Sequence, residues 1–171
     1  MTELTAVVVL AIVLLGTGWR LSWLGTRVDR AHARAERTWA ALDAALVRRA
    51  RGVAELALTP RFDPATALLV SEAAAAALEP ALSRADREQA ESDLSHVLDL
   101  VTSELGDGSQ GLADLRDRAV LSRRLHNDAV ATARTLHRRR TVRLFRLARH
   151  AAEPTPFEMA DDRRPSWAAE W

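Results

Sequence analysis

Histidines and carboxylates are the side chains in this sequence that could bind a metal ion or transfer protons. Asp93 and His96 have the spacing of half a di-iron motif, because side chains three positions apart share one face of a helix. The further inward-facing glutamates that such a site needs are not evident, and no two histidines have the His-x-x-x-His spacing. We therefore predict no catalytic, metal or cofactor site, and we see no small-molecule substrate.

Arginines are the second kind of side chain with binding chemistry, because a guanidinium group pairs well with phosphate. One set repeats by sevens near the N-terminus, and a second, denser cluster occupies residues 137–149, interleaved with Leu144, Phe145 and Leu147. A basic amphipathic segment of this kind favours an anionic membrane surface. The candidate lipid-headgroup contacts are Arg20, Arg27, Arg34, Arg139, Arg143 and Arg146.

Two other interpretations of residues 137–149 stay open. The segment could close a helical bundle, with its arginines in solvent and with Phe145 and Leu147 packed inside. It could also contact nucleic acid, but a single phenylalanine offers little stacking surface and the formal net charge of the chain is only +1. Nucleic acid is therefore not a partner that we expect.

An uncharged apolar run precedes the first arginines. Leu4–Trp19 has no charged side chain, and extension to Leu24 adds only Arg20 and reaches the ~20 residues that a membrane-spanning helix requires. Trp19 and Trp23 suit the membrane–water interface. We therefore predict a transmembrane anchor with its interface over residues 1–24. The alternatives are a cleaved secretory signal, which Gly16-Thr17-Gly18 would suit, and a buried helix of a soluble protein.

The charge bias around the anchor predicts its orientation. Glu3 and the terminal amine are the only charges before the apolar run, whereas several arginines follow it. Because arginine-rich flanks stay on the cytoplasmic side, we expect a single-pass protein of the cell (plasma) membrane with its N-terminus outside. The C-terminal domain would then be cytoplasmic.

The rest of the chain has the periodicity of an all-α protein. Apolar residues recur at helical spacing from the anchor to Leu58, and further helices are expected at about 64–78, 86–105, 111–138 and 141–148. Asp63 and Pro64 suit the start of the second helix, and Asp86 with Gln89 resembles a capping box for the third. Whether 64–105 forms one bent helix or two is left open.

These elements predict a single N-terminal transmembrane helix that continues into an antiparallel bundle of about four helices. The bundle would occupy residues 25–150, and the proline-containing residues 151–171 would form a flexible tail. The sequence has no cysteine, so disulfides and thiolate metal sites are excluded.

Three segments carry a more specific pattern. Residues 36–49 combine Trp39, a Leu-Asp pair and a basic pair, and residues 123–130 have the form Arg-x-x-His-Asn-x-x-Val. The third segment is Pro156-Phe157-Glu158. In this order, after an N-terminal anchor, they resemble the LemA family of bacterial membrane proteins, in which a tyrosine usually stands at the position of His126. The resemblance implies a single-pass anchor, a short external N-terminus, an antiparallel helical domain and no established enzymatic activity.

Some residues in these segments are candidates for structural polar contacts: Asp43, Arg123 and Asn127. Asp43 could form an ion pair with Arg123 or Arg124 of another helix, and Asn127 could donate or accept a hydrogen bond across the bundle.

Our leading hypothesis from the sequence is a non-enzymatic, membrane-anchored helical scaffold. Its partners would be the lipid bilayer and either an unknown protein or a second copy of the chain, because small-residue faces such as Ala73–Ala77 allow helices to approach closely. One alternative is a sensor of anionic lipid surfaces that uses the basic segment. An enzyme of uncharacterised type is the remaining alternative, and no motif supports it.

Overall fold

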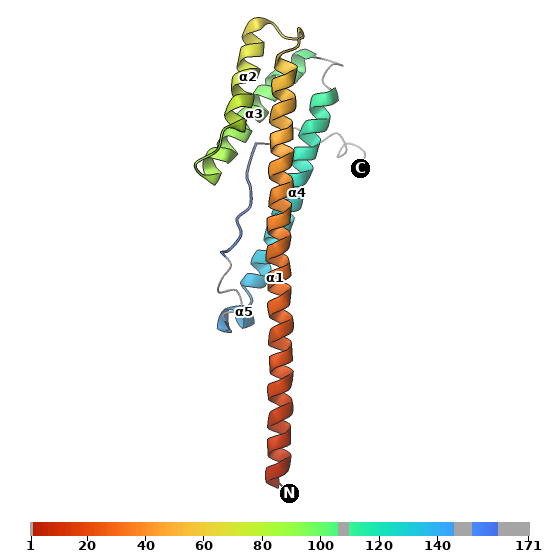
Figure 1. Ribbon diagram of the computed structural model, residues 1–171, viewed down its shortest axis with the longest axis vertical. Helices are drawn as coiled ribbons and strands as arrows, with labels where there is room; N and C mark the ends of the chain where they lie inside the picture. The colour runs from red at the N-terminus through yellow and green to blue at the C-terminus, as the bar shows by residue number, and fades with distance from the viewer. Residues whose placement is uncertain (1, 106–109, 146–151, 161–171) are drawn as a thin grey trace. The chain divides into compact units, whose positions relative to one another are not determined.

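The computed structural model describes residues 2–105, 110–145 and 152–160, and the side chains of residues 103–105 and 110 are outside this description. These residues form five helices and contain no strand (Figure 1). The helices are α1 (Thr2–Ala57), α2 (Pro64–Leu78), α3 (Arg84–Leu105), α4 (Gln110–His137) and α5 (Arg140–Leu144). The all-α prediction is confirmed, and residues 64–105 form two helices rather than one bent helix.

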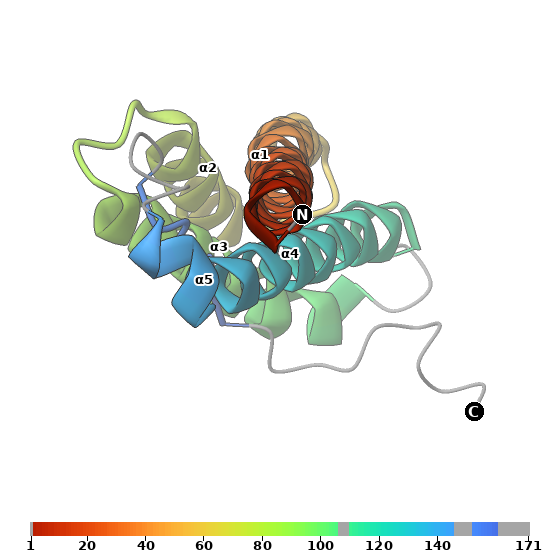
Figure 2. The same cartoon turned by 90° about the horizontal axis from the view of Figure 1, so that it is seen from below.

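The chain divides into two compact units. Unit 1 comprises Met1–Glu36 and Asp128–Thr155, and unit 2 comprises Arg37–Asn127 and Pro156–Trp171. Helices α1 and α4 each contribute one part to either unit, and they lie beside each other (Figure 2).

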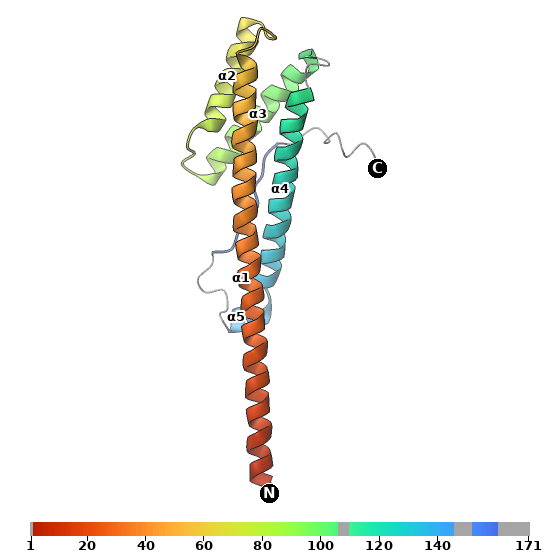
Figure 3. The same cartoon turned by 45° about the vertical axis from the view of Figure 1, so that its right-hand side comes forward.

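Unit 1 contains the apolar start of α1. This helix is long and apolar enough to cross a membrane, and the side chains of its most apolar window are exposed to the surroundings. Further along, one core cluster joins Leu24 and Val28 of α1 to Leu136 of α4 and to Val142 of α5. Val142 therefore fixes α5 against α1 (Figure 3).

Unit 2 has a core to which four helices contribute. Its main cluster contains Val53 of α1, Val70 of α2, Leu94 of α3 and Leu112 of α4, all of them buried. The spacing of these residues within their helices follows the helical repeat, so the apolar face of each helix turns toward the others.

Local capping determines where α2 and α3 begin. The carboxylate of Asp63 accepts hydrogen bonds from the backbone N–H groups of Ala65 and Thr66, and Pro64 occupies the first turn of α2. These hydrogen bonds, led by one from the Thr66 side chain, lower the pKa of Asp63 from its ordinary value of 3.8. The capping box of α3 starts three residues earlier than predicted, because Ser83 Oγ accepts from the N–H of Asp86 and donates to its carboxylate.

The predicted tail is not a tail over its first part. Phe157 is fully buried and Met159 is nearly so, because both join a core cluster of unit 2 with Leu42, Leu46 and Ala119. Residues 161–171, with their two tryptophans, are outside the described residues. Residues 156–160, which the sequence assigns to the tail, therefore contact the core through the aromatic ring of Phe157.

Candidate functional site

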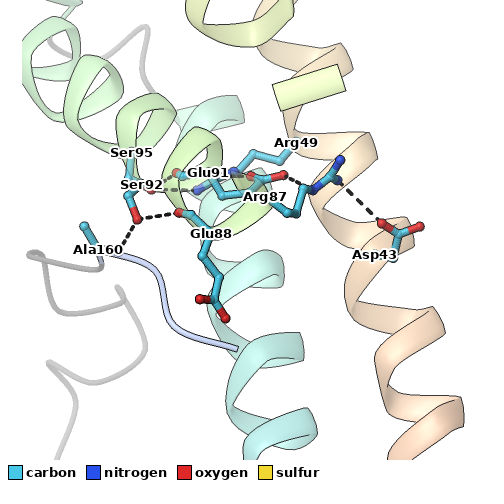
Figure 4. A network of polar contacts seen from close by, with 8 residues as sticks. All are labelled: Asp43, Arg49, Arg87, Glu88, Glu91, Ser92, Ser95 and Ala160. Carbon is cyan, nitrogen blue, oxygen red and sulfur yellow. Dashed lines mark hydrogen bonds and ion pairs between the residues drawn. The ribbon is translucent and has the colours of Figure 1, made fainter. Parts of the chain in front are cut away.

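Unit 2 holds a buried ion pair between α1 and α3. The Nη2 atom of Arg49 lies 2.5 Å from Oε2 of Glu91, and it also donates to the backbone oxygen of Glu91 at 2.9 Å. The Nη1 atom of Arg49 donates to Ser95 Oγ at 3.0 Å. Arg49 is 1% exposed and Glu91 0%, so this network connects two helices in the interior (Figure 4).

Arg87 extends the network to the surface. Its Nε atom lies 3.1 Å from Oε1 of Glu91, and its Nη2 atom lies 3.5 Å from the carboxylate of Asp43 (Figure 4). The structure thus gives Asp43 a partner on α3, whereas the sequence pointed to Arg123 or Arg124 on α4. Arg123 is half-buried on α4.

The C-terminal segment, residues 156–160, is held in place by hydrogen bonds to its backbone. The side chain of Asn127 donates to the oxygen of Phe157 at 3.0 Å and accepts from its N–H at 2.8 Å. Further contacts join Arg84 to the oxygen of Pro156, the N–H of Glu158 to Glu88, and the N–H of Ala160 to Ser92. Asn127 therefore contacts this segment instead of a neighbouring helix.

Aromatic contacts surround the buried Phe157 ring. Its centroid lies 5.6 Å from that of Trp39, which in turn lies 5.5 Å from the ring of His126. The guanidinium carbon of Arg84 lies 4.3 Å from the Trp39 centroid. Thr38 Oγ1 is 3.3 Å from Nδ1 of His126. These contacts fix the segment by packing.

Sequence reasoning missed Arg49 and Glu91, although both had a signal. Leu42, Leu46 and Val53 lie on one apolar face of α1, and Arg49 occupies the position between Leu46 and Val53 that the helical repeat places on the same face. Glu91 likewise lies at helical spacing from Leu94 and from the next apolar positions of α3, so it shares their face of the helix. A charged residue in phase with an apolar face predicts a buried, paired charge.

Unit 1 has a pocket between α1 and the segment that carries α5, and its volume is about 350 Å³. The residues that line it are Val13, Gly16, Thr17, Arg20, Leu21, Trp23, Leu24, Arg139, Thr141 and Phe145. Phe145 is 47% exposed, so it is not packed inside as the bundle-closing interpretation requires. Leu147 lies outside the described residues.

The six arginines proposed as headgroup contacts have different environments. Arg20 and Arg139 line the same pocket although they are far apart in the sequence. Arg27 lies over the ring of Trp23 at 5.5 Å, whereas Arg34 and Arg143 are exposed elsewhere on unit 1. Arg146 lies outside the described residues.

Within the part of the chain that the structure describes, no group of three or more histidine, aspartate or glutamate side chains could hold a metal ion. Asp93 and His96 are exposed on α3, and Asp93 accepts a hydrogen bond from Gln89 at 2.8 Å.

No protein-family model, curated protein or solved structure matches the chain.

Proposed function

We propose that the protein is a non-enzymatic, single-pass membrane-anchored helical scaffold of the LemA type. One observation carries the proposal: α1 runs unbroken from Thr2 to Ala57, yet its apolar first part is exposed while its later part is buried in the core of unit 2. Leu15, for example, is 75% exposed, and a stretch of exposed apolar side chains of this kind is stable in an apolar environment, which a bilayer supplies. The same helix then forms part of an antiparallel bundle on the cytoplasmic side.

The outer face of α2 is the surface that we assign to protein contact. Leu68 and Leu69 are exposed there, on a short helix composed almost entirely of apolar and small residues. Two neighbouring exposed leucines on a rigid helix offer a partner an apolar contact without any rearrangement of the core.

Two measurements test this function. A C-terminal reporter pair, one active in the cytoplasm and one outside, should give a cytoplasmic signal in the membrane fraction of a bacterial host. A photo-crosslinker at Leu68 should give a discrete heavier adduct, and one at the exposed Arg118 of α4 should not. Monomer alone from both positions, or export of the reporter, would count against the scaffold.

A second candidate function is binding to an anionic membrane surface. The observation that favours it is the exposure of Trp19, Trp23, Leu144 and Phe145 in the unit that also carries Arg20 and Arg139. Exposed aromatic rings with adjacent arginines suit the interfacial region of a bilayer. Neutral substitutions of Arg139 and Arg143 should then weaken the response of the protein to anionic lipid in a salt-dependent way.

A further inference from the structure

We infer that the Arg20–Arg139 pocket of unit 1 binds one anionic phospholipid, with the lipid phosphate between the two guanidinium groups. This inference rests on the membrane anchor of the proposed function and adds a defined site and ligand class to it. It differs from general attraction to an anionic surface, because it requires a particular pocket and not only a number of positive charges.

The lining of the pocket matches the two parts of a phospholipid. Arg20 and Arg139 supply positive charge, and no acidic side chain is among the described residues that line the pocket. Arginine forks bind phosphate oxygens well because two N–H groups can donate in parallel. Most of the remaining lining is apolar, which suits an acyl chain and does not suit a free phosphate ion.

The position of the pocket along α1 also agrees with a bound phospholipid. Arg20 directly follows the uncharged run Leu4–Trp19, and Val13 lines the same pocket about two turns deeper. A phosphate at Arg20 would therefore lie at headgroup level, beside the exposed Trp23, while a chain beside Val13 would lie within the hydrocarbon.

The opposite wall of the pocket is preformed. Val142 is buried with Leu24 and Val28, so the segment that carries Arg139, Thr141 and Phe145 is anchored to α1. A preformed wall reduces the conformational entropy that lipid binding would otherwise cost.

The charge test uses the full chain in nanodiscs of mixed phosphatidylglycerol and phosphatidylcholine, with retained lipid identified by native mass spectrometry. Arg20→Gln and Arg139→Gln should each reduce retained phosphatidylglycerol by at least about tenfold, because each variant loses a charged hydrogen-bond donor to the lipid phosphate. Arg30→Gln and Arg140→Gln are matched controls, because both arginines are exposed and neither lines the pocket. Equal loss in the variants and their controls would overturn the inference in favour of general surface charge.

The steric test leaves the charge unchanged. A Cβ atom at Gly16 or at Gly18 would meet nothing within 4 Å, so both sites accept a larger side chain, but only Gly16 lines the pocket. Gly16→Leu should expel the bound lipid, whereas Gly18→Leu should retain it. Equal retention in these two variants, or displacement of the lipid by inorganic phosphate, would overturn the inference.

Membrane fractionation and far-UV circular dichroism of each variant separate the possible failures. Wild-type protein that is absent from the membrane fraction would refute both the proposed function and the pocket. Folded, membrane-bound variants that all retain the same lipid would refute only the pocket.

Discussion

The buried ion pair of unit 2 leads to an asymmetric prediction. Glu91→Gln removes the carboxylate that pairs with Arg49, and it also removes one of the two carboxylates beside Arg87. Arg49→Met removes one positive charge but leaves Glu91 with Arg87, 3.1 Å away. We expect the glutamate substitution to destabilise the protein more than the arginine substitution.

The burial of the Arg49–Glu91 pair determines how much stability each substitution removes. Breaking a buried pair by removing one partner costs about 3–5 kcal/mol, because the remaining charge stays desolvated. Arg49 is 1% exposed, so Glu91→Gln should cost this amount. In a domain of this size each 1 kcal/mol lowers the Tm by about 2–4 °C, which corresponds to a decrease of about 6–20 °C. Arg49→Met should cost about 1–3 kcal/mol, since Glu91 keeps one charged partner.

Thermal unfolding of the full chain in detergent, followed by far-UV circular dichroism, measures these losses. The double variant Arg49→Met/Glu91→Gln should lose less than the two single variants together, because the second substitution no longer leaves an unpaired buried charge. Glu72→Gln on the exposed face of α2 is the control and should leave the Tm nearly unchanged. Additive losses, or a Glu91→Gln effect no larger than the control, would refute this account of the network.

Three further substitutions test the C-terminal segment and the cap of α2. Phe157→Ala should cost about 3–5 kcal/mol in denaturant unfolding, because the ring is fully buried; a loss as small as that of the exposed Leu144→Ala would contradict the packing. Asn127→Leu removes two hydrogen bonds to Phe157 and should cost about 1–3 kcal/mol, and an unchanged Tm would dispose of this role. Asp63→Asn should be less stable than wild type at neutral pH. Because folding lowers the pKa of Asp63 below 3.8, this stability difference should disappear as the pH falls through the lowered pKa. A stability difference that stays constant with pH would show that the charge of the Asp63 carboxylate does not stabilise the protein.

Features that depend only on residues close together in the sequence were predictable without the structure. The start of α2 at Pro64 follows from Asp63 and Pro64 alone, and the apolar run Leu4–Trp19 marks the candidate membrane span without any tertiary information. The cap of α3 lies three residues before the predicted Asp86–Gln89 pattern, because Ser83 and Asp86 form the same kind of capping pattern. The error is one of register within a correctly predicted helix.

The sequence by itself determined the helical class, most helix boundaries and the exposed apolar start of α1, since local propensity and periodicity act over a few residues. Only the tertiary structure decided that Arg49 pairs with Glu91, 42 positions away, and that Phe157 enters a core instead of a tail. It also decided that Arg20 and Arg139 share one pocket. The physical reason is that burial and pairing depend on which helix faces meet, and periodicity states only which faces are apolar.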